Sequence, residues 1–285
     1  MDRSNHVGDA MKDICVIVPT FNNLWMIREF LKSLASHKTA HRIITIVVDN
    51  GSTDQTAAFL SEWKSFGTNR YICSLQDNIG YGPGVNRGIE CVRTLVDQTT
   101  ETGNEDRFVS LFPDILVCND DVEFMPFCID NLEETLDRDG AAGLVGAKLF
   151  HADGTIQHAG AYLDRAYNGY HYGWGKRPTD YNDVVQSQTM RDTQFVTGAM
   201  ILIRWRALQE VGVFDEQFGL GYYEDVDLCY RMRDKGWHVV YNPFAQAIHH
   251  EGATSGKLGS VGLQEMILRN RNIFISKWAT KWEDE

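Results

Sequence analysis

Three consecutive polar residues, Asn119, Asp120 and Asp121, directly follow an apolar run at residues 115–118. This abrupt ending predicts a buried strand that presents the three side chains at its carboxyl end, where ligands of open α/β sheets bind. Two adjacent carboxylates repel each other unless a cation lies beside them. Because Mg²⁺ and Mn²⁺ prefer oxygen ligands and share phosphate oxygens, the run indicates a metal-bound diphosphate. A solvated acidic turn is the alternative interpretation.

Alternating strand and helix patterns precede these carboxylates. Asn22 or Asn23 is expected to cap the first helix, and Ser52 or Thr53 the second. This alternation predicts the α/β class, a mostly parallel Rossmann-like sheet flanked by helices and joined by right-handed crossovers. The expected strands are β-branched runs at residues 14–18, 43–48 and 71–75.

A glycine-rich run follows the third expected strand. Glycines at positions 80, 82, 84 and 88 are expected to let the backbone approach a ligand, and the run opens a helix over residues 85–96. The run lacks the G-x-G-x-x-G spacing after a first strand, so the dinucleotide-binding fingerprint is absent.

The second half of the sequence is less regular. Residues 150–191 show no clean period and predict irregular strands and loops. Residues 195–203 predict a strand in which Gly198 marks a close backbone approach. The remaining expected elements are a strand at 143–147, helices at 126–137 and 205–211, a helix opening at Glu224, strands at 237–241 and 245–248, and a basic helix at 263–282.

Composition narrows the class of protein. The 285 residues carry a formal net charge of −12, which argues against nonspecific binding to nucleic acid or anionic membranes. Six scattered cysteines without metal-ligand spacing indicate reduced core thiols. The polar start lacks a secretory leader, and no apolar run reaches the roughly 20 residues of a membrane span. We therefore expect a cytoplasmic protein, one that meets the inner face of the membrane only if its acceptor is lipid-linked.

Several motifs, in this order, resemble the family 2 glycosyltransferases of the GT-A fold. The resemblance covers residues 13–256 and is greatest to rhamnosyl- and galactofuranosyl-transferases that build bacterial surface polysaccharides. The Gln-x-x-Arg-Trp motif of the processive synthases is absent. The motifs are Val-Pro-Thr-Phe-Asn at 18–22, Val-Asp-Asn-Gly-Ser-Thr-Asp at 48–54, Asn78-x-Gly80 with Asn86-x-Gly88, Asn-Asp-Asp at 119–121, Thr-Gly-Ala at 197–199, Tyr-Glu-Asp-Val-Asp at 223–227, and Ile248-His249.

The resemblance implies a domain organisation. A flexible lead at residues 1–12 would precede a single GT-A domain at 13–256, and a helical tail would follow at 257–285. Within the domain, residues 13–124 would form the nucleotide-binding half, and 125–256 an irregular acceptor half.

The resemblance also implies a nucleotide-sugar site. Asp49 would accept a hydrogen bond from the ring imide of the base, although an Asx turn in Asp-Asn-Gly is the alternative. The donor would be a UDP-, dTDP- or GDP-linked sugar. The residues expected to bind it are Pro19, Thr20, Phe21, Asn22, Asp49, Asn78, Gly80, Asn119, Asp120, Gly198 and Ala199.

A divalent cation, Mn²⁺ or Mg²⁺, is implied at Asp121 and His249. Asn119 occupies a place where the family often has Asp, so the expected site carries one formal charge fewer. Imidazole suits Mn²⁺ better than Mg²⁺. A purely structural role for His249 is the alternative, and the adjacent His250 is a second candidate for the ligand.

Asp225 corresponds to the general base of an inverting displacement, in which it would take the proton of the attacking acceptor hydroxyl. Stabilisation of the helix start by Glu224 and Asp225 is the alternative. Trp174, Tyr223 and Glu224 are expected to contact a glycan or lipid-linked acceptor. For the aromatic residues around Trp174, a core under a long loop is an equally good interpretation.

Two rival functions remain at this point. One is a nucleotidyltransferase that forms sugar nucleotides, which the absence of glycine and basic residues at 19–22 disfavours. The other is a noncatalytic glycan- or nucleotide-binding module on a decayed transferase fold. The basic helix at 263–282 is expected to be a solvated charged face, and peripheral contact with anionic lipid is the alternative.

Overall fold

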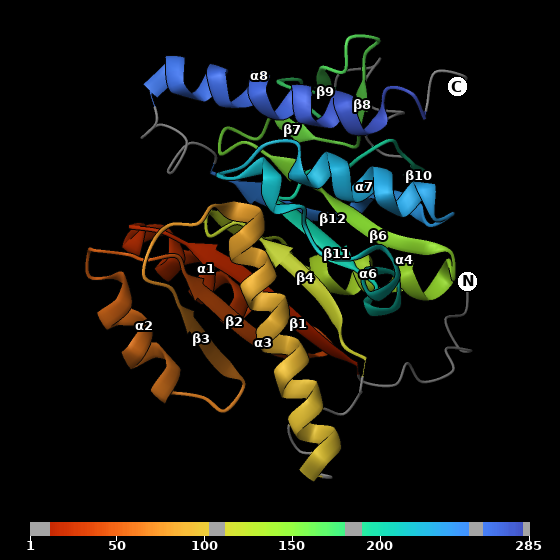
Figure 1. Ribbon diagram of the computed structural model, residues 1–285. Coiled ribbons are helices and arrows are strands. Elements are labelled where there is room, and N and C mark those ends of the chain that lie inside the picture. Colours follow the sequence, from red (N-terminus) through yellow and green to blue (C-terminus); the bar gives the residue numbers. More distant parts are fainter. Residues whose placement is uncertain (1–11, 103–111, 180–189, 251–258, 282–285) are drawn as a thin grey trace.

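A ten-stranded, mostly parallel sheet forms the centre of the molecule (Figure 1). The computed structural model describes residues 12–102, 112–179, 190–250 and 259–281. The main path of the sheet has the order β10-β12-β6-β11-β4-β1-β2-β3, with β5 paired to β12 and β7 to β6. The strands are β1 Asp13–Thr20, β2 Arg42–Asp49, β3 Arg70–Ser74, β4 Asp114–Cys118, β5 Val122–Phe124, β6 Ala142–Phe150, β7 Ile156–His158, β8 Ala161–Leu163, β9 Gly169–His171, β10 Arg191–Asp192, β11 Met200–Ile203 and β12 His238–His249.

Helices cover both faces of the sheet, which confirms the expected α/β class. Alternate residues of β1 enter the two cores: Cys15 and Ile17 pack with α3 and α7, while Ile14, Val16 and Val18 pack with α1 and α4. The helices are α1 Leu24–Ser36, α2 Thr56–Ser65, α3 Tyr81–Thr102, α4 Cys128–Arg138, α6 Trp205–Val211, α7 Glu224–Asp234 and α8 Gly259–Trp278. None of the helices in the described ranges is long and apolar enough to cross a membrane.

The strand predicted at 195–203 is too long. Only Met200–Ile203 forms β11, which lies antiparallel between β4 and β6. The residues before it turn because Gly198 binds two side chains from other elements. Because β11 is antiparallel to β4, its amino end lies beside the carboxyl end of β4, where ligands of such sheets bind.

The helix predicted at 85–96 begins earlier, at Tyr81, and takes in three of the glycines. These glycines pack against protein and do not open onto a ligand. A Cβ on Gly88 would lie 2.4 Å from Cγ2 of Ile17, so glycine lets α3 contact β1 closely. The expectation that this run approaches a ligand is therefore wrong at Gly88.

The predicted helix caps are only partly correct: Asn23 takes the N-cap position of α1, whereas neither Ser52 nor Thr53 caps α2. The side chain of Asn23, at the start of α1, makes no capping hydrogen bond. The helix α2 starts at Thr56, whose N–H donates to Oδ1 of Asp54. Asn22 instead accepts from the N–H groups of Thr53 and Asp54, so it joins the loops that follow β1 and β2.

The two strands expected at 237–241 and 245–248 are one strand, β12, with a register shift between Asn242 and Gln246. Asn242 stabilises this irregularity, because its Oδ1 accepts from the N–H of Phe244 and its Nδ2 donates to Oγ1 of Thr135. The bulge lets the strand continue to His249 beside the end of β6.

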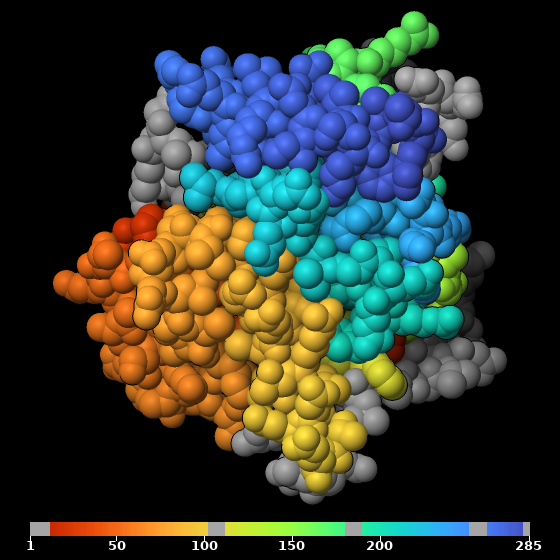
Figure 2. Space-filling model, viewed as in Figure 1, coloured from red at the N-terminus to blue at the C-terminus, as the bar shows by residue number. Residues whose placement is uncertain are grey.

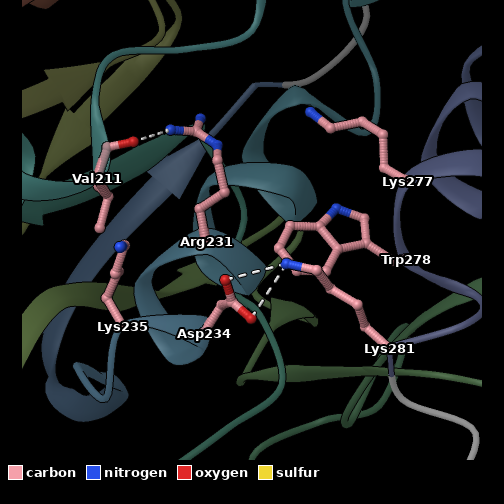
Figure 3. A pocket seen from close by; sticks show the side chains of 7 residues that line it. All are labelled: Val211, Arg231, Asp234, Lys235, Lys277, Trp278 and Lys281. Atoms are coloured by element: carbon pink, nitrogen blue, oxygen red, sulfur yellow. Dashed lines mark hydrogen bonds and ion pairs between the residues drawn. The ribbon is translucent and has the colours of Figure 1, made fainter.

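The helix α8 lies across the top of the molecule, over the α7 region (Figures 1 and 2). Lys277 forms ion pairs with Asp215 and Asp227, each 2.6 Å long, and Lys281 pairs with Asp234. These contacts surround a pocket of about 370 Å³ between α7 and α8 (Figure 3). The cations of the tail therefore hold the helix on the domain, which contradicts the expected solvated face.

Some expectations lie outside the described residues. They are the lead except Lys12, part of the irregular region at 180–189, and the boundary between domain and tail at 256/257.

Replacing Gly88 with Ala tests the close contact between α3 and β1. The added methyl group would overlap the side chain of Ile17, so we expect Gly88→Ala to lower the free energy of unfolding by about 1–3 kcal/mol. Gly140→Ala is the matched control, since nothing lies within 4 Å of its Cβ position. Urea unfolding of both variants measures the difference; equal stability would contradict the packing role of Gly88.

Candidate active site

Asp121 and His249 meet at the end of the sheet. His249 ends β12 and pairs with Val122 of β5, directly after Asp121. Nε2 of His249 lies 3.0 Å from Oδ1 of Asp121, and both residues are 8% exposed. The neighbouring His250 instead turns its Nε2 toward Glu123, so the structure brings His249 to the acidic run.

The hydrogen bonds of His249 leave its Nε2 without a proton. Nδ1 donates to Oε1 of Gln157 over 2.7 Å, and Nδ2 of Asn119 donates to Nε2 over 3.0 Å. A hydrogen-bond acceptor at the other ring nitrogen, as Gln157 is here, fixes the tautomer of metal-binding histidines. Buried Oδ1 of Asp121 accordingly finds no hydrogen-bond donor within the described ranges. An acceptor atom facing another acceptor atom fits a cation bound by both.

Asp121 and His249 supply only part of a metal shell. Within the part of the chain that the structure describes, no group of three His, Cys, Asp or Glu side chains could hold a metal. Mg²⁺ and Mn²⁺ commonly take one or two protein ligands and complete the shell with substrate phosphates and water. A pocket of about 250 Å³ between α1 and β5 lies beside Asp121.

Asp120 joins the ends of β4 and β1. Its Oδ2 accepts from Oγ1 of Thr20 over 2.6 Å and from Nδ2 of Asn23 over 3.1 Å. The carboxylate is therefore held against the end of β1, where the predicted donor-binding residues Pro19 and Phe21 also lie. Both strand ends form one edge of the sheet.

The other predicted nucleotide-binding residues lie along the same edge. Asp49 ends β2, is buried and accepts from the N–H of Ser52, so it makes the turn contact that was the alternative to base binding. Asn78 accepts from the N–H of Gly80. Gly80 has a φ of +102°, and a Cβ there would lie 2.2 Å from the carbonyl oxygen of Gly219. The backbone of Gly80 is thus packed against the loop that leads to α7.

Asp225 reaches this edge through Gly198. The N–H of Gly198 donates to Oδ2 of Asp225 over 2.8 Å, and the N–H of Asn119 donates to the carbonyl oxygen of Ala199 over 2.9 Å. The turn at residues 198–199 therefore connects the start of α7 to the end of β4. Asp225 is partly exposed. Burial raises its pKa, whereas hydrogen bonds from the N–H groups of Gly198 and Val226 lower it.

Tyr81 is a site residue that the sequence did not reveal. Its hydroxyl donates to the carbonyl oxygen of Gly198 over 2.6 Å, and its ring meets the edge of Phe214. Burial raises its pKa well above the usual range, and the negative charges of Glu224, Asp225 and Asp121 raise it further. Through Gly198, the hydroxyl of Tyr81 is thus joined to Asp225. The only available signal was an aromatic residue inside a glycine-rich run.

Glu224 differs from its neighbour Asp225. Glu224 is 6% exposed, and its Oε2 has no hydrogen-bond partner within the described ranges. Burial raises its pKa well above the usual range, and the charge of Asp225 adds to this shift. The two carboxyl groups therefore differ in environment: burial favours the protonated form of Glu224, whereas two N–H groups stabilise the carboxylate of Asp225.

The predicted acceptor residues lie in different environments. Trp174 is half exposed and makes edge contacts with the rings of His151 and His171. Tyr223 is buried against Phe274, and its hydroxyl donates to the carbonyl oxygen of Tyr167. The ring of Tyr223 therefore lies in the core, whereas the ring of Trp174 is accessible.

The arrangement combines a two-ligand cation position, a donor-side crevice and a separate acidic pair in one place. A model described as glycosyltransferase-like family 2 matches residues 12–261. The chain belongs to this family. It is therefore a glycosyltransferase, and the expected family is confirmed.

Relatives with known names agree with this assignment. The N-acetylglucosaminyl-diphospho-decaprenol L-rhamnosyltransferase of Mycobacterium tuberculosis is 29% identical over 250 residues, which cover 85% of this chain and 77% of that protein. The O-antigen biosynthesis protein RfbC of Myxococcus xanthus is 26% identical over 247 residues, 85% of this chain and 17% of that protein.

Solved structures confirm the GT-A fold. The mannosyltransferase PcManGT of Pyrobaculum calidifontis, in complex with GDP-Man and Mn²⁺, superposes with a TM-score of 0.62 at 15% identity. GalNAc-T7 with UDP, GalNAc and Mn²⁺ gives 0.67 at 12% identity. This chain is covered to 94% and 96%, but it spans only 65% and 49% of those two chains.

The protonated state of Glu224 predicts a pH dependence of stability. A Glu whose pKa is raised by folding stabilises the protein fully below its unfolded value, near 4.5, and loses this contribution as pH rises through the folded pKa. We therefore expect Glu224→Gln to gain stability relative to the wild type as pH rises from about 4.5 to 8.

Urea unfolding at several pH values measures this gap. Glu265→Gln, at an exposed position of α8, serves as the control and should show no comparable trend. A gap that stays constant over the whole range would contradict a buried, protonated Glu224.

Proposed function

We propose that the protein is a metal-dependent, inverting glycosyltransferase that moves a sugar from a nucleotide diphosphate to an acceptor hydroxyl, with Asp225 as general base. The observation that carries the proposal is that the turn at residues 198–199 joins Asp225 to the end of β4, where Asp121 lies beside His249. One carboxylate is matched to a cation, and the other is free to accept a proton.

The donor would lie along the sheet edge that Thr20, Asp49 and Asp120 form. Asp49 is buried at the end of β2, where a carboxylate can accept from the imide N–H of a pyrimidine or from a guanine edge. Two GT-A neighbours were solved with GDP-Man and with UDP, which supports this ligand class without fixing the base. We propose UDP-, dTDP- or GDP-linked sugars as donors.

Asp121 and His249 would hold Mn²⁺ or Mg²⁺ against the diphosphate. The unsatisfied Oδ1 of Asp121 and the unprotonated Nε2 of His249 support this site, as does Mn²⁺ in both GT-A neighbours. The bound cation would stabilise the negative charge on the leaving diphosphate. Asn119 contributes an uncharged amide in place of a third carboxylate. The negative charge that attracts the cation is therefore smaller.

Asp225 would act on the opposite side of the donor sugar. As the acceptor oxygen forms a bond to the anomeric carbon, its proton passes to Asp225, and the electrons of the breaking bond leave with the nucleotide diphosphate. A single displacement inverts the anomeric configuration and needs no covalent nucleophile. Hydrogen bonds from Gly198 and Val226 hold the carboxylate in position. Raising its pKa by burial makes it a stronger base.

The acceptor would be a glycan or a lipid-linked saccharide. The mycobacterial relative is named for a lipid diphosphate acceptor, which supports the second class. Trp174 is the accessible aromatic residue on which a sugar could stack. Glu224 would contribute a protonated carboxyl group beside the acceptor hydroxyl, and Tyr223 would contribute backbone. Family membership disfavours the sugar-nucleotide-forming rival, so a noncatalytic module is the alternative that experiment must exclude.

Asp225→Asn tests the proposed base. Asparagine keeps the size of the side chain but cannot take the proton, so we expect transfer to fall at least about 100-fold while nucleotide binding is retained. The assay follows nucleotide release from UDP-, dTDP- and GDP-sugars with Mn²⁺, with and without a lipid-linked saccharide. Asp97→Asn, at an exposed position of α3, is the control. A variant that keeps most of its kcat would exclude Asp225 as the base, and a wild type inactive on every donor would favour a binding module.

Asp121→Ala tests the cation site. Removing the carboxylate should weaken Mn²⁺-dependent nucleotide binding at least about tenfold, because His249 alone is a weak site. Calorimetric titration of UDP, dTDP and GDP with and without Mn²⁺ gives the affinities, and chelation by EDTA should abolish the difference. Glu123→Ala, two residues away and facing His250, is the control. Unchanged affinity in Asp121→Ala would remove Asp121 from the site.

A further inference from the structure

We infer that the C-terminal helix α8 is part of the catalytic apparatus, because Asn270 holds the loop that aims Asp225. Asn270 is thus a positioning residue, which does not itself touch the substrate. This inference rests on the proposed function for its catalytic consequence. Its structural half can be measured independently.

The loop that Asn270 contacts has a strained backbone. Gly219, Gly221, Tyr222 and Tyr223 all have positive φ angles, of 67°, 150°, 70° and 72°. Tyrosine rarely adopts this conformation, which persists only where the surroundings enforce it. The last of these residues, Tyr223, directly precedes Glu224, where α7 begins, and Asp225 follows. Relaxation of this loop would therefore move the start of α7.

Asn270 supplies the restraint. Its side chain is completely buried, and Nδ2 donates to the carbonyl oxygens of Phe218, Gly221 and Tyr222 over 2.7, 2.6 and 3.0 Å. Oδ1 accepts from Arg269, so the NH₂ group must face the loop. A second donor on Arg269 binds the carbonyl oxygen of Gln217. One amide thus binds three backbone acceptors of the loop, with one of its two hydrogens shared between two carbonyl oxygens.

The same loop also contacts Gly80 and Tyr81, on the donor side of the proposed site. The N–H of Tyr81 donates to the carbonyl oxygen of Leu220 over 3.3 Å. Gly219 is so close to Gly80 that a Cβ on Gly80 would overlap its carbonyl group. The restraint imposed by Asn270 is therefore transmitted to Tyr81 and, through Gly198, to Asp225.

The helix is fixed on the domain on both sides of Asn270. Toward its carboxyl end, Phe274 packs against the rings of Tyr223 and Tyr230, and Nε1 of Trp278 donates to buried Asp227. On the amino side, Arg269 binds the loop. The family model ends at residue 261, before Asn270. Asn270 and Arg269, whose side chains restrain the loop, therefore lie outside the family model.

Asn270→Asp in the full-length protein tests whether Asn270 restrains the loop. The substitution keeps the shape of the side chain but places an oxygen where the NH₂ group faced three carbonyl oxygens. We expect hydrogen–deuterium exchange to rise at least about tenfold in peptides covering residues 217–227, with β1 and β2 unchanged. Asn272→Asp makes the same change at an exposed position of the same helix and should leave exchange unchanged.

The catalytic consequence is measured on the same two variants. Misplacing Asp225 should lower kcat for transfer in Asn270→Asp by roughly 10- to 100-fold. A carboxyl group buried beside carbonyl oxygens has a raised pKa, and its neutral form can donate one hydrogen bond. The ratio of kcat in Asn270→Asp to kcat in the wild type should therefore rise as pH falls from about 8 to 5.5. The same ratio for Asn272→Asp should stay constant.

Three outcomes would overturn the inference. They are unchanged exchange at residues 217–227, a kcat equal to that of Asn272→Asp despite faster exchange, and a kcat ratio independent of pH. If Asn270→Asp does not fold, Asn270→Ser replaces it: it keeps one donor without adding charge, and unchanged exchange there would be equally decisive. A wild type without transfer activity would count against the proposed function, while the exchange measurement would still decide whether Asn270 holds the loop.

Discussion

Mutual repulsion of carboxyl groups is the constraint on which this structure depends. Asp225 lies next to Glu224 and is joined through the turn at Gly198 to the end of β4, which Asp121 follows. Like charges at short range cannot all ionise without compensation. Each group has a different environment: Asp225 accepts two N–H groups, buried Glu224 retains its proton, and Asp121 faces the bare nitrogen of His249. Within the described ranges, Oδ1 of Asp121 is thus left without a hydrogen-bond donor, at a position suited to a cation.

The topology of the sheet brings these groups together. A wholly parallel arrangement would place the amino end of β11 at the opposite edge from the end of β4. Because β11 runs antiparallel between β4 and β6, Gly198 and Ala199 lie beside Asn119. Glycine at 198 then lets Tyr81 and Asp225 approach from two sides, since a Cβ there would lie 3.3 Å from Cβ of Asp225. The reversed strand is therefore what links the cation side to the base side.

Sequence reasoning succeeded where local pattern and burial agree. The strands β1, β2 and β4 are buried on both faces, so their apolar runs predict them directly. It failed where a residue serves a distant contact. Gly88 looked like part of a ligand loop, but it is needed for the contact of α3 with β1. Tyr81 and Asn270 carry no local signal, since their partners lie 117 and about 50 residues away. The roles of Asp121, His249 and Asp225 came from family resemblance, and periodicity alone would not have indicated them.

The two faces of α7 explain why the basic helix α8 packs close to the acidic residues of the proposed site. Residues two apart on a helix point to different sides. Asp225 accordingly faces Gly198, while fully buried Asp227 faces α8 and binds Arg231, Lys277 and Trp278. A buried carboxylate is stable only with such partners, so the cations of the tail are already engaged and are poor candidates for lipid contact. Docking of α8 fixes the rotation of α7 about its axis. The direction in which Asp225 points is therefore set from the far side of its own helix.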